Sequence, residues 1–174
     1  MVRSNDRGFT LIELLIVVAI ISIIAAMAVP GLLRARMTGN ETSAIASLKV
    51  TTSSQVAYSA ACGNGAYAAT YVILGTAPAA GSEGFISADL GSSATPAKSG
   101  YNFTLTGGAG STAGPADCNA TPTISTYYAT ARPMALNTTG TRSFAVNAGN
   151  TIWQIAGAAA PTEPFAASGG TTIQ

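Results

Sequence analysis

The longest apolar run of the chain lies near its beginning. Every position from Leu14 to Leu33 is apolar except Ser22, and the basic residues Arg34 and Arg36 follow directly. About 20 apolar residues in a helix span the hydrocarbon core of a bilayer. The pattern therefore predicts a membrane-spanning helix close to the N-terminus, with the two arginines among the lipid headgroups.

A helical period continues beyond this run. It is carried by a stripe of residues that we expect to face the rest of the protein: Met37, Ile45, Leu48, Thr52 and Val56. Arg34, Arg36, Asn40, Glu41 and Lys49 lie largely off that stripe. The glycines after Cys62 are typical of a helix C-terminus. The pattern predicts one helix of about 53 residues, with an apolar half over 9–33 and an amphipathic half over 34–61.

Pro30 and Gly31 interrupt this helix near the end of its apolar half. Proline lacks the N–H of a helical hydrogen bond and clashes with the preceding turn, at a cost of about 3 kcal/mol. Two interpretations stay open: a kink at the membrane surface, or a weak point where the helix stretches or melts during assembly.

The sequence of the remainder, residues 62–174, predicts a globular head. Its first part, 63–97, is rich in Gly, Ala, Ser and Pro and predicts an ordered loop with a turn or two of helix. The expected anchors of this loop are Tyr67, Tyr71, Phe85, Ile86 and Leu90. Strand patterns follow at 100–106, 124–133, 142–148 and 151–155, and Gly149-Asn150 is a hairpin signal. Three or four antiparallel strands after one long helix predict an α+β fold, with the amphipathic half packed on one sheet face.

Composition excludes several kinds of function. Only 9% of residues are charged, against a usual share of about 25%, and the formal charge of +1 gives no sign of a nucleic-acid partner. The sequence has no His, which removes His-based catalysis and the commonest transition-metal ligand. The glycine-rich stretch 107–114 lacks the Lys of a phosphate-binding loop. Glu83, Asp89 and Asp117 are too scattered for a calcium loop. We therefore expect no enzyme, no cofactor and no metal site.

The two cysteines, Cys62 and Cys118, allow one internal disulfide or two free thiols. A bridge between them would tie the predicted helix end to the segment before the second strand. A disulfide needs an oxidising compartment, which would place the head outside the cytoplasm. The Asn-x-Ser/Thr triplets at Asn40, Asn102, Asn119 and Asn137 are expected by chance in a Thr-rich chain.

The N-terminus is open to three interpretations. The first is a secretory signal peptide cut after Ala28. The second is an ordinary transmembrane anchor. The third is a segment whose short leader is removed on the cytoplasmic side, which leaves the apolar run in place. Glu13 helps to separate them, because a carboxylate at the centre of a spanning helix costs about 2.5–3.5 kcal/mol. Cleavage between Gly8 and Phe9 would create an ammonium one helical turn from Glu13, so that the carboxylate meets this group or a neighbour's.

The stretch "RGFTLIELLIVVAIISIIAAMAVP" resembles the N-terminus of type IV prepilins. The Gly8-Phe9 junction, Glu13, the apolar run and Pro30 match that pattern in order, and the resemblance is strong over about the first 60 residues. It implies a leader over 1–8, cleavage after Gly8 and N-methylation of Phe9 by a prepilin peptidase. It also implies the pilin fold, and filaments of this family melt near the position of Pro30 and Gly31.

The resemblance implies a structural protein that polymerises with itself into an extracellular pilus through its apolar helix. Glu13 would then set axial register by meeting the Phe9 ammonium of a neighbouring subunit. The implied partners are the prepilin peptidase and methyltransferase, the inner-membrane assembly machinery and, before assembly, the inner-membrane bilayer with the head outside. Two alternatives remain: a pseudopilin of a type II secretion system, and a membrane-tethered binding module that never polymerises.

Overall fold

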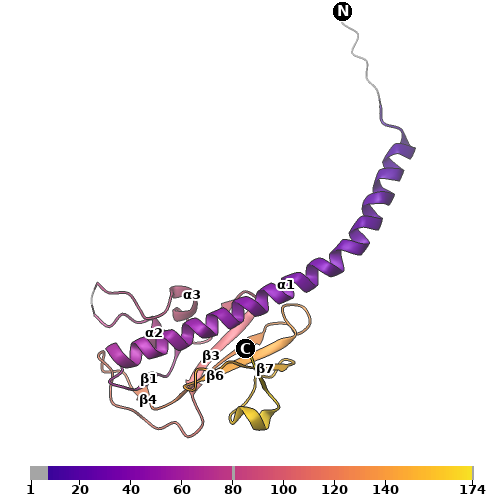
Figure 1. Cartoon of the computed structure of the whole chain (residues 1–174). Coiled ribbons are helices and arrows are strands. Elements are labelled where there is room, and N and C mark those ends of the chain that lie inside the picture. Colours follow the sequence, from indigo (N-terminus) through magenta and orange to yellow (C-terminus); the bar gives the residue numbers. More distant parts are fainter. Residues whose placement is uncertain (1–7, 80, 174) are drawn as a thin grey trace, which may run out of the picture. The chain divides into compact units, whose positions relative to one another are not determined.

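The chain divides into two compact units, Met1–Arg36 and Met37–Gln174. The structure, a computed structural model, describes residues 8–79 and 81–173. One helix, α1 (Leu11–Ala61), supplies nearly all of the first unit that is described and continues into the second (Figure 1). The predicted long helix is thus confirmed, with its first turn beginning two residues after Phe9.

Pro30 lies inside α1 and does not end it. Its nitrogen has no hydrogen to donate to the carbonyl of Ala26, so one helical hydrogen bond is missing at this point. The helix ends at Ala61 because the chain turns there: the backbone N–H groups of Cys62 and Gly63 both donate to the Tyr58 carbonyl oxygen, at 2.9 and 2.7 Å. Gly65 then takes a positive φ of 87°, which suits glycine.

The head holds a six-stranded antiparallel sheet in the order β2-β3-β5-β6-β7-β8. Its strands are β2 (Ala97–Lys98), β3 (Tyr101–Gly107), β5 (Tyr127–Pro133), β6 (Arg142–Asn147), β7 (Trp153–Ala156) and β8 (Thr171–Thr172). A separate pair joins β1 (Tyr67–Ala68) to β4 (Thr123–Ile124). The expectation of three or four strands is therefore wrong in number. The additional strands have two residues each, too few for an alternating pattern to be visible in sequence.

The middle of the sheet alternates large and small side chains across its strands. Phe103 on β3 and Phe144 on β6 both face Ala131 on β5, and Leu105 faces Ala129. All five side chains are buried. Small residues on the central strand thus leave volume that the larger neighbours fill, as close packing of a core requires.

The second half of α1 contributes a buried face that differs from the predicted stripe. Its buried residues are Glu41, Ala44, Ser47, Leu48, Thr51, Ser54, Gln55 and Tyr58. Of the predicted stripe only Leu48 is fully buried, whereas Val56 is 51% exposed. The prediction failed because it weighted apolar residues, while this face is built from small and polar side chains that hydrogen-bond to the head.

Gln55 illustrates how such a polar face is stabilised. Its amide donates to the Ala68 carbonyl oxygen at 2.8 Å and accepts from the Ala68 N–H at 2.9 Å. Ser54 Oγ donates to the Phe85 carbonyl oxygen at 2.8 Å. Because buried polar groups are costly only when unpaired, these bonds fix the helix against specific backbone positions of the segment that follows it.

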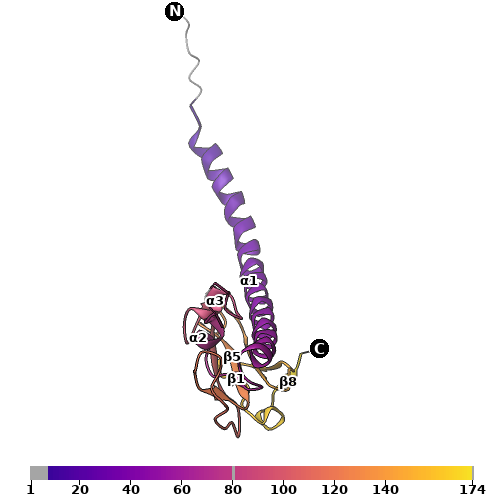
Figure 2. The ribbon, with the colours of Figure 1, turned by 90° about the vertical axis from the view of Figure 1, so that its left-hand side faces the viewer.

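That segment carries two short helices, α2 (Tyr71–Gly75) and α3 (Ala88–Gly91). They lie on one side of the second half of α1, with β8 and the C-terminus on the other (Figure 2). The predicted turns of helix are confirmed. Tyr71 and Leu90 are fully buried, as anchors of this segment should be.

An ion pair between the buried Glu41 and the half-buried Arg142 holds the start of the packed part of α1 on the sheet. Glu41, which we had placed off the buried face, is only 4% exposed. Its Oε2 accepts hydrogen bonds from Nη2 and Nε of Arg142 at 2.6 and 2.9 Å, and its Oε1 accepts from the Thr141 N–H at 2.8 Å. Burial raises the pKa of Glu41, but the bonds from Thr141 and Arg142 outweigh it and hold the pKa below 4.5.

This network predicts a pH-dependent contribution to stability. Glu41→Gln should lower the free energy of unfolding by about 1.5–3 kcal/mol at pH 7, the value of hydrogen bonds to charged groups. Because the folded pKa lies below the unfolded one, the contribution is complete above pH 4.5 and is lost as the pH falls through the folded value. Urea unfolding of the chain in detergent, followed by Trp153 fluorescence at a series of pH values, measures the loss of stability and its dependence on pH.

The matched control is Glu83→Gln, which changes an exposed carboxylate in the loop before α3. It should shift stability by less than about 0.5 kcal/mol at every pH. A Glu41→Gln deficit that stays constant as the medium is acidified would contradict a role of the charge.

Candidate membrane and assembly segment

The first half of α1 exposes its apolar side chains on all sides. From Leu11 to Leu33 the large apolar residues are 47–80% exposed. None of the most apolar 18-residue stretch of this helix is buried. Within the part of the chain that the structure describes, α1 is the one helix long and apolar enough to cross a membrane. A helix that is apolar all round needs either lipid or other apolar helices as its surroundings.

The one polar side chain between Leu14 and Leu33, that of Ser22, is satisfied locally. Ser22 Oγ donates to the Val18 carbonyl oxygen at 2.7 Å, so its hydroxyl needs no external partner in an apolar medium. Gly31 has open space where a Cβ would stand. Close packing within the described chain therefore does not require a glycine at this position.

Glu13 takes part in a capping box at the N-terminus of α1. Its Oε2 accepts hydrogen bonds from the N–H and the Oγ1 hydroxyl of Thr10, at 3.0 and 2.6 Å, and the Glu13 N–H donates to Thr10 Oγ1 at 3.3 Å. Two N–H groups that a helix leaves without an internal partner are thereby satisfied. Among the described residues, the two bonds to the carboxylate use Oε2 and leave Oε1 of Glu13 without a partner.

Thr10 was missed by the sequence analysis, although a signal for it existed. The residues Thr10-Leu11-Ile12-Glu13 fit the Thr-x-x-Glu signature that precedes an apolar helix. The sequence prediction gave the Glu13 carboxylate an ammonium partner and did not include Thr10.

The predicted processing site lies at the open end of the described chain. Gly8 is the first described residue and is exposed, and Phe9 is 82% exposed. Both precede the first helical residue, Leu11. The rest of the predicted leader, residues 1–7, lies outside the described residues.

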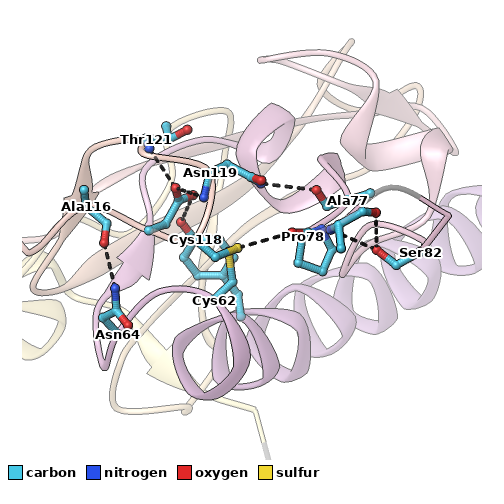
Figure 3. The surroundings of a disulfide bond; sticks show 12 residues. Cys62, Asn64, Ala77, Pro78, Ser82, Ala116, Cys118, Asn119 and Thr121 are labelled. Atoms are coloured by element: carbon cyan, nitrogen blue, oxygen red, sulfur yellow. Dashed lines mark hydrogen bonds between the residues drawn. A yellow bond between two sulfur atoms is a disulfide. The ribbon is translucent and has the colours of Figure 1, made fainter.

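The head contains the predicted disulfide. Cys62 and Cys118 are joined, with their Cα atoms 4.8 Å apart. Around the bridge, Asn64 Nδ2 donates to the Ala116 carbonyl oxygen at 2.8 Å and Asn119 Nδ2 to that of Ala77 at 3.2 Å (Figure 3). The bridge therefore sits where the end of α1 meets two loops that are distant in sequence.

Asp117 organises the loop that carries Cys118. Its Oδ1 accepts from the N–H groups of Asn119 and Thr121, at 2.9 and 2.7 Å, and its Oδ2 accepts from the Tyr58 hydroxyl at 2.7 Å. Burial raises the pKa of Asp117, but the bonds from Thr121, Tyr58 and Asn119 keep it below its ordinary value. A carboxylate with these partners has a structural role, and among the described residues no three Asp, Glu, Cys or His side chains gather to hold a metal ion.

The comparisons with known proteins match the N-terminal region of the chain. The model of the prokaryotic N-terminal methylation motif matches residues 3–29. Over 38 residues the chain is 63% identical to the type IV wide pilus major component PilA4 of Thermus thermophilus. Its N-terminal region is thus similar to that of a type IV pilin. The match spans 22% of this chain and 29% of PilA4, and no solved structure matches.

The matched motif covers most of the N-terminal residues singled out in the sequence. Gly8, Phe9, Glu13 and the apolar residues up to Val29 all fall inside the matched motif. Pro30 and Gly31 lie directly after it. The long helix followed by an antiparallel sheet is the architecture that the resemblance implied.

The bridge generates a prediction about stability. Cys118→Ser should lower the free energy of unfolding of the head by up to about 4 kcal/mol, the loop-closure value for a separation of 56 residues. Urea unfolding under non-reducing conditions measures the loss. The double change Cys62→Ser with Cys118→Ser should match the single variant, because either removes the same bond. Equal alkylation of both thiols in the native, unreduced protein would contradict the bridge.

Proposed function

We propose that this chain is the structural subunit of a type IV pilus. It enters the inner membrane as a single-pass precursor with the head outside the cytoplasm. It is cleaved after Gly8, methylated on the new amine of Phe9, and polymerised through residues 9–33. The proposal rests on one observation. The match to the methylation motif leads into a helix whose apolar side chains are exposed and are covered by no other part of the described chain.

The physical argument concerns what happens when the helix leaves lipid. Apolar surface exposed to water costs about 25 cal/mol per Å², and the side chains from Leu11 to Leu33 expose most of their area. Other helices of the same kind can cover this surface. Extraction from the membrane and assembly into a filament are therefore coupled, and no covalent bond between subunits is required.

Glu13 supports the proposal through its geometry. The capping box uses Oε2, which leaves Oε1 able to accept a hydrogen bond from an ammonium group. A neighbouring subunit has such a group at Phe9 once the leader is removed. The local and intermolecular roles of Glu13 are therefore compatible, and pairing in an apolar filament core avoids an uncompensated buried charge.

The processing step is tested by mass analysis of the mature N-terminus. We expect the chain to begin at Phe9 and to carry a methyl group on its amine. A mature chain that begins at Val29 would establish a signal peptide instead and would remove the segment proposed for assembly.

The role of Glu13 is tested by a pair of variants that separate charge from capping. Glu13→Gln retains a capping side chain, since Gln also serves at this position, but removes the charge. Thr10→Ala removes the capping partner and keeps the charge. If Glu13 pairs with a neighbour's Phe9, the Glu13→Gln chain should insert and be processed yet form few filaments, because an ammonium without its partner costs several kcal/mol when buried.

Thr10→Ala is the matched control and should assemble close to wild type, with a loss of helix stability of about 1 kcal/mol. Filaments are counted by electron microscopy, and processing is followed by mass. The opposite ranking, with Thr10→Ala defective and Glu13→Gln normal, would mean that Glu13 acts only as a helix cap.

The same experiment separates the two alternative functions. Fibres that stay short and periplasmic would indicate a type II secretion pseudopilus. A processed monomer that persists in membranes would indicate a tethered binding module.

A further inference from the structure

The sheet face opposite the core carries a polar groove. On this face the register places Asn102 beside Arg132 and Thr104 beside Thr130, across β3 and β5. Two hollows of about 400 and 270 Å³ lie here, and Thr104 and Arg132 line both of them. The hollows therefore form one continuous groove, which we call the sheet groove. Its size falls near the roughly 300–1,000 Å³ in which proteins hold small molecules.

The residues after β7 form one wall of the sheet groove. The Nε atom of Arg132 donates to the Ala158 carbonyl oxygen at 2.8 Å. The Tyr128 hydroxyl donates to the Pro161 carbonyl oxygen at 2.6 Å. Because both donors are on β5, these bonds hold the segment 158–161 beside that strand. The wall itself consists of small apolar side chains, those of Ala158, Ala159 and Ala160.

Arg132 presents unused donors to this groove. Within the described residues, the Nε bond is the one hydrogen bond of its guanidinium, and Arg132 takes part in no ion pair. The carboxylate of Glu163, which follows the wall in sequence, is engaged elsewhere: it accepts from the Ala109 N–H and from the Asn147 amide. The two Nη groups can therefore donate two parallel hydrogen bonds, the arrangement in which arginine binds a carboxylate.

Groups that suit sugar hydroxyls lie next to Arg132. Thr104 Oγ1 and Thr130 Oγ1 are 2.7 Å apart and share one hydrogen, so the second hydroxyl hydrogen can be donated to a ligand. Asn102 is exposed, and its amide can both donate and accept. Arg132 and Thr130 lie two residues apart on one face of β5, which is about 7 Å. The carboxylate and the ring hydroxyls of a uronic acid are separated by a similar distance.

Other classes of partner fit this groove less well. Both β3 and β5 have a neighbouring strand on each side within the sheet, so neither offers a free edge to a peptide strand. The groove has one cation, whereas a nucleic acid is bound by several. An uncharged ligand would leave the Arg132 guanidinium without a counter-charge.

We propose that the sheet groove binds a uronic acid residue of an acidic polysaccharide. The carboxylate accepts two hydrogen bonds from Nη1 and Nη2 of Arg132. The ring hydroxyls bond to Thr104, Thr130 and the Asn102 amide, and the apolar face of the ring packs on the alanine wall. The inference concerns the head alone and does not depend on whether the chain polymerises.

Isothermal titration calorimetry of the full-length chain tests this site. The chain is held in micelles of octaethylene glycol dodecyl ether, a detergent with neither charge nor sugar, and is titrated with tetragalacturonate. We expect saturable binding that weakens as sodium chloride is added. Arg132→Gln should raise the Kd at least about tenfold, because it removes hydrogen bonds between charged groups. Arg132→Lys should give an intermediate Kd, because lysine cannot make the two parallel bonds.

The matched control is Lys49→Gln. Lys49 is an exposed cation of α1 that does not line the sheet groove, so this variant changes the net charge equally and should bind as the wild type does. Thermal unfolding verifies that Arg132→Gln is folded. If it is not, Asn102→Ala replaces it and should raise the Kd at least about threefold. Wild-type affinity in the folded variant would overturn the inference.

Two further ligands separate a sugar from other anions. Fully methyl-esterified tetragalacturonate keeps the sugar and loses the charge, whereas tetraglutamate keeps the carboxylates and loses the ring hydroxyls. Both should bind at least about tenfold more weakly than tetragalacturonate. Equal binding of either ligand, or no saturable binding of tetragalacturonate, would contradict the proposed site. Self-association that is lost in Arg132→Gln, without any saccharide binding, would also contradict it, because the occupant would then be a second copy of the chain.

Discussion

The apolar side chains of α1 between Leu11 and Leu33 have no cover within the described chain, and this constraint organises the rest of the molecule. Such a surface is stable in lipid or against other apolar helices and unstable in water. The second half of the same helix meets the opposite requirement, because it is packed on a head that is exposed to water. One continuous helix therefore joins two regions that need different surroundings.

The head holds its half of the helix by specific polar contacts as well as by apolar burial. Glu41 is fixed to Arg142 at the beginning of the packed part, Gln55 pairs with the backbone of Ala68 further along, and Cys62 is bonded to Cys118 at the end. Fixed points distributed along the helix resist force applied along its axis better than a smooth apolar face, which can slide. The filament proposed for this chain would require that resistance when it is under tension.

Glu13 shows how one side chain can serve two physical needs. A carboxylate near a helix N-terminus is favoured by the helix dipole and caps free N–H groups. In an apolar environment the same charge requires a partner. Thr10 engages one carboxylate oxygen, and among the described residues the other oxygen accepts no hydrogen bond, as the proposed pairing with a neighbouring ammonium requires. Capping thereby also orients the carboxylate before any partner arrives.

Local patterns determined much of this protein from the sequence alone. The extent of α1, the alternation Tyr101-Phe103-Leu105 on β3, the hairpin at Gly149-Asn150 and the anchors Tyr71 and Leu90 all follow from periodicity and turn chemistry over a few residues. The predicted processing site, Gly8-Phe9, is likewise a short contiguous motif. The capping box of Thr10 and Glu13 was also readable, since its signature spans four residues.

Only the tertiary structure decided which face of α1 is buried. Glu41 looked like a surface charge because its partners, Thr141 and Arg142, lie 100 and 101 residues away. The two-residue strands β2 and β8 exist because longer strands beside them offer free hydrogen-bonding edges. The sheet groove at Arg132 exists because the segment after β7 is held beside β5. Contacts between distant segments have no sequence period, so their partners become visible only when the chain is folded.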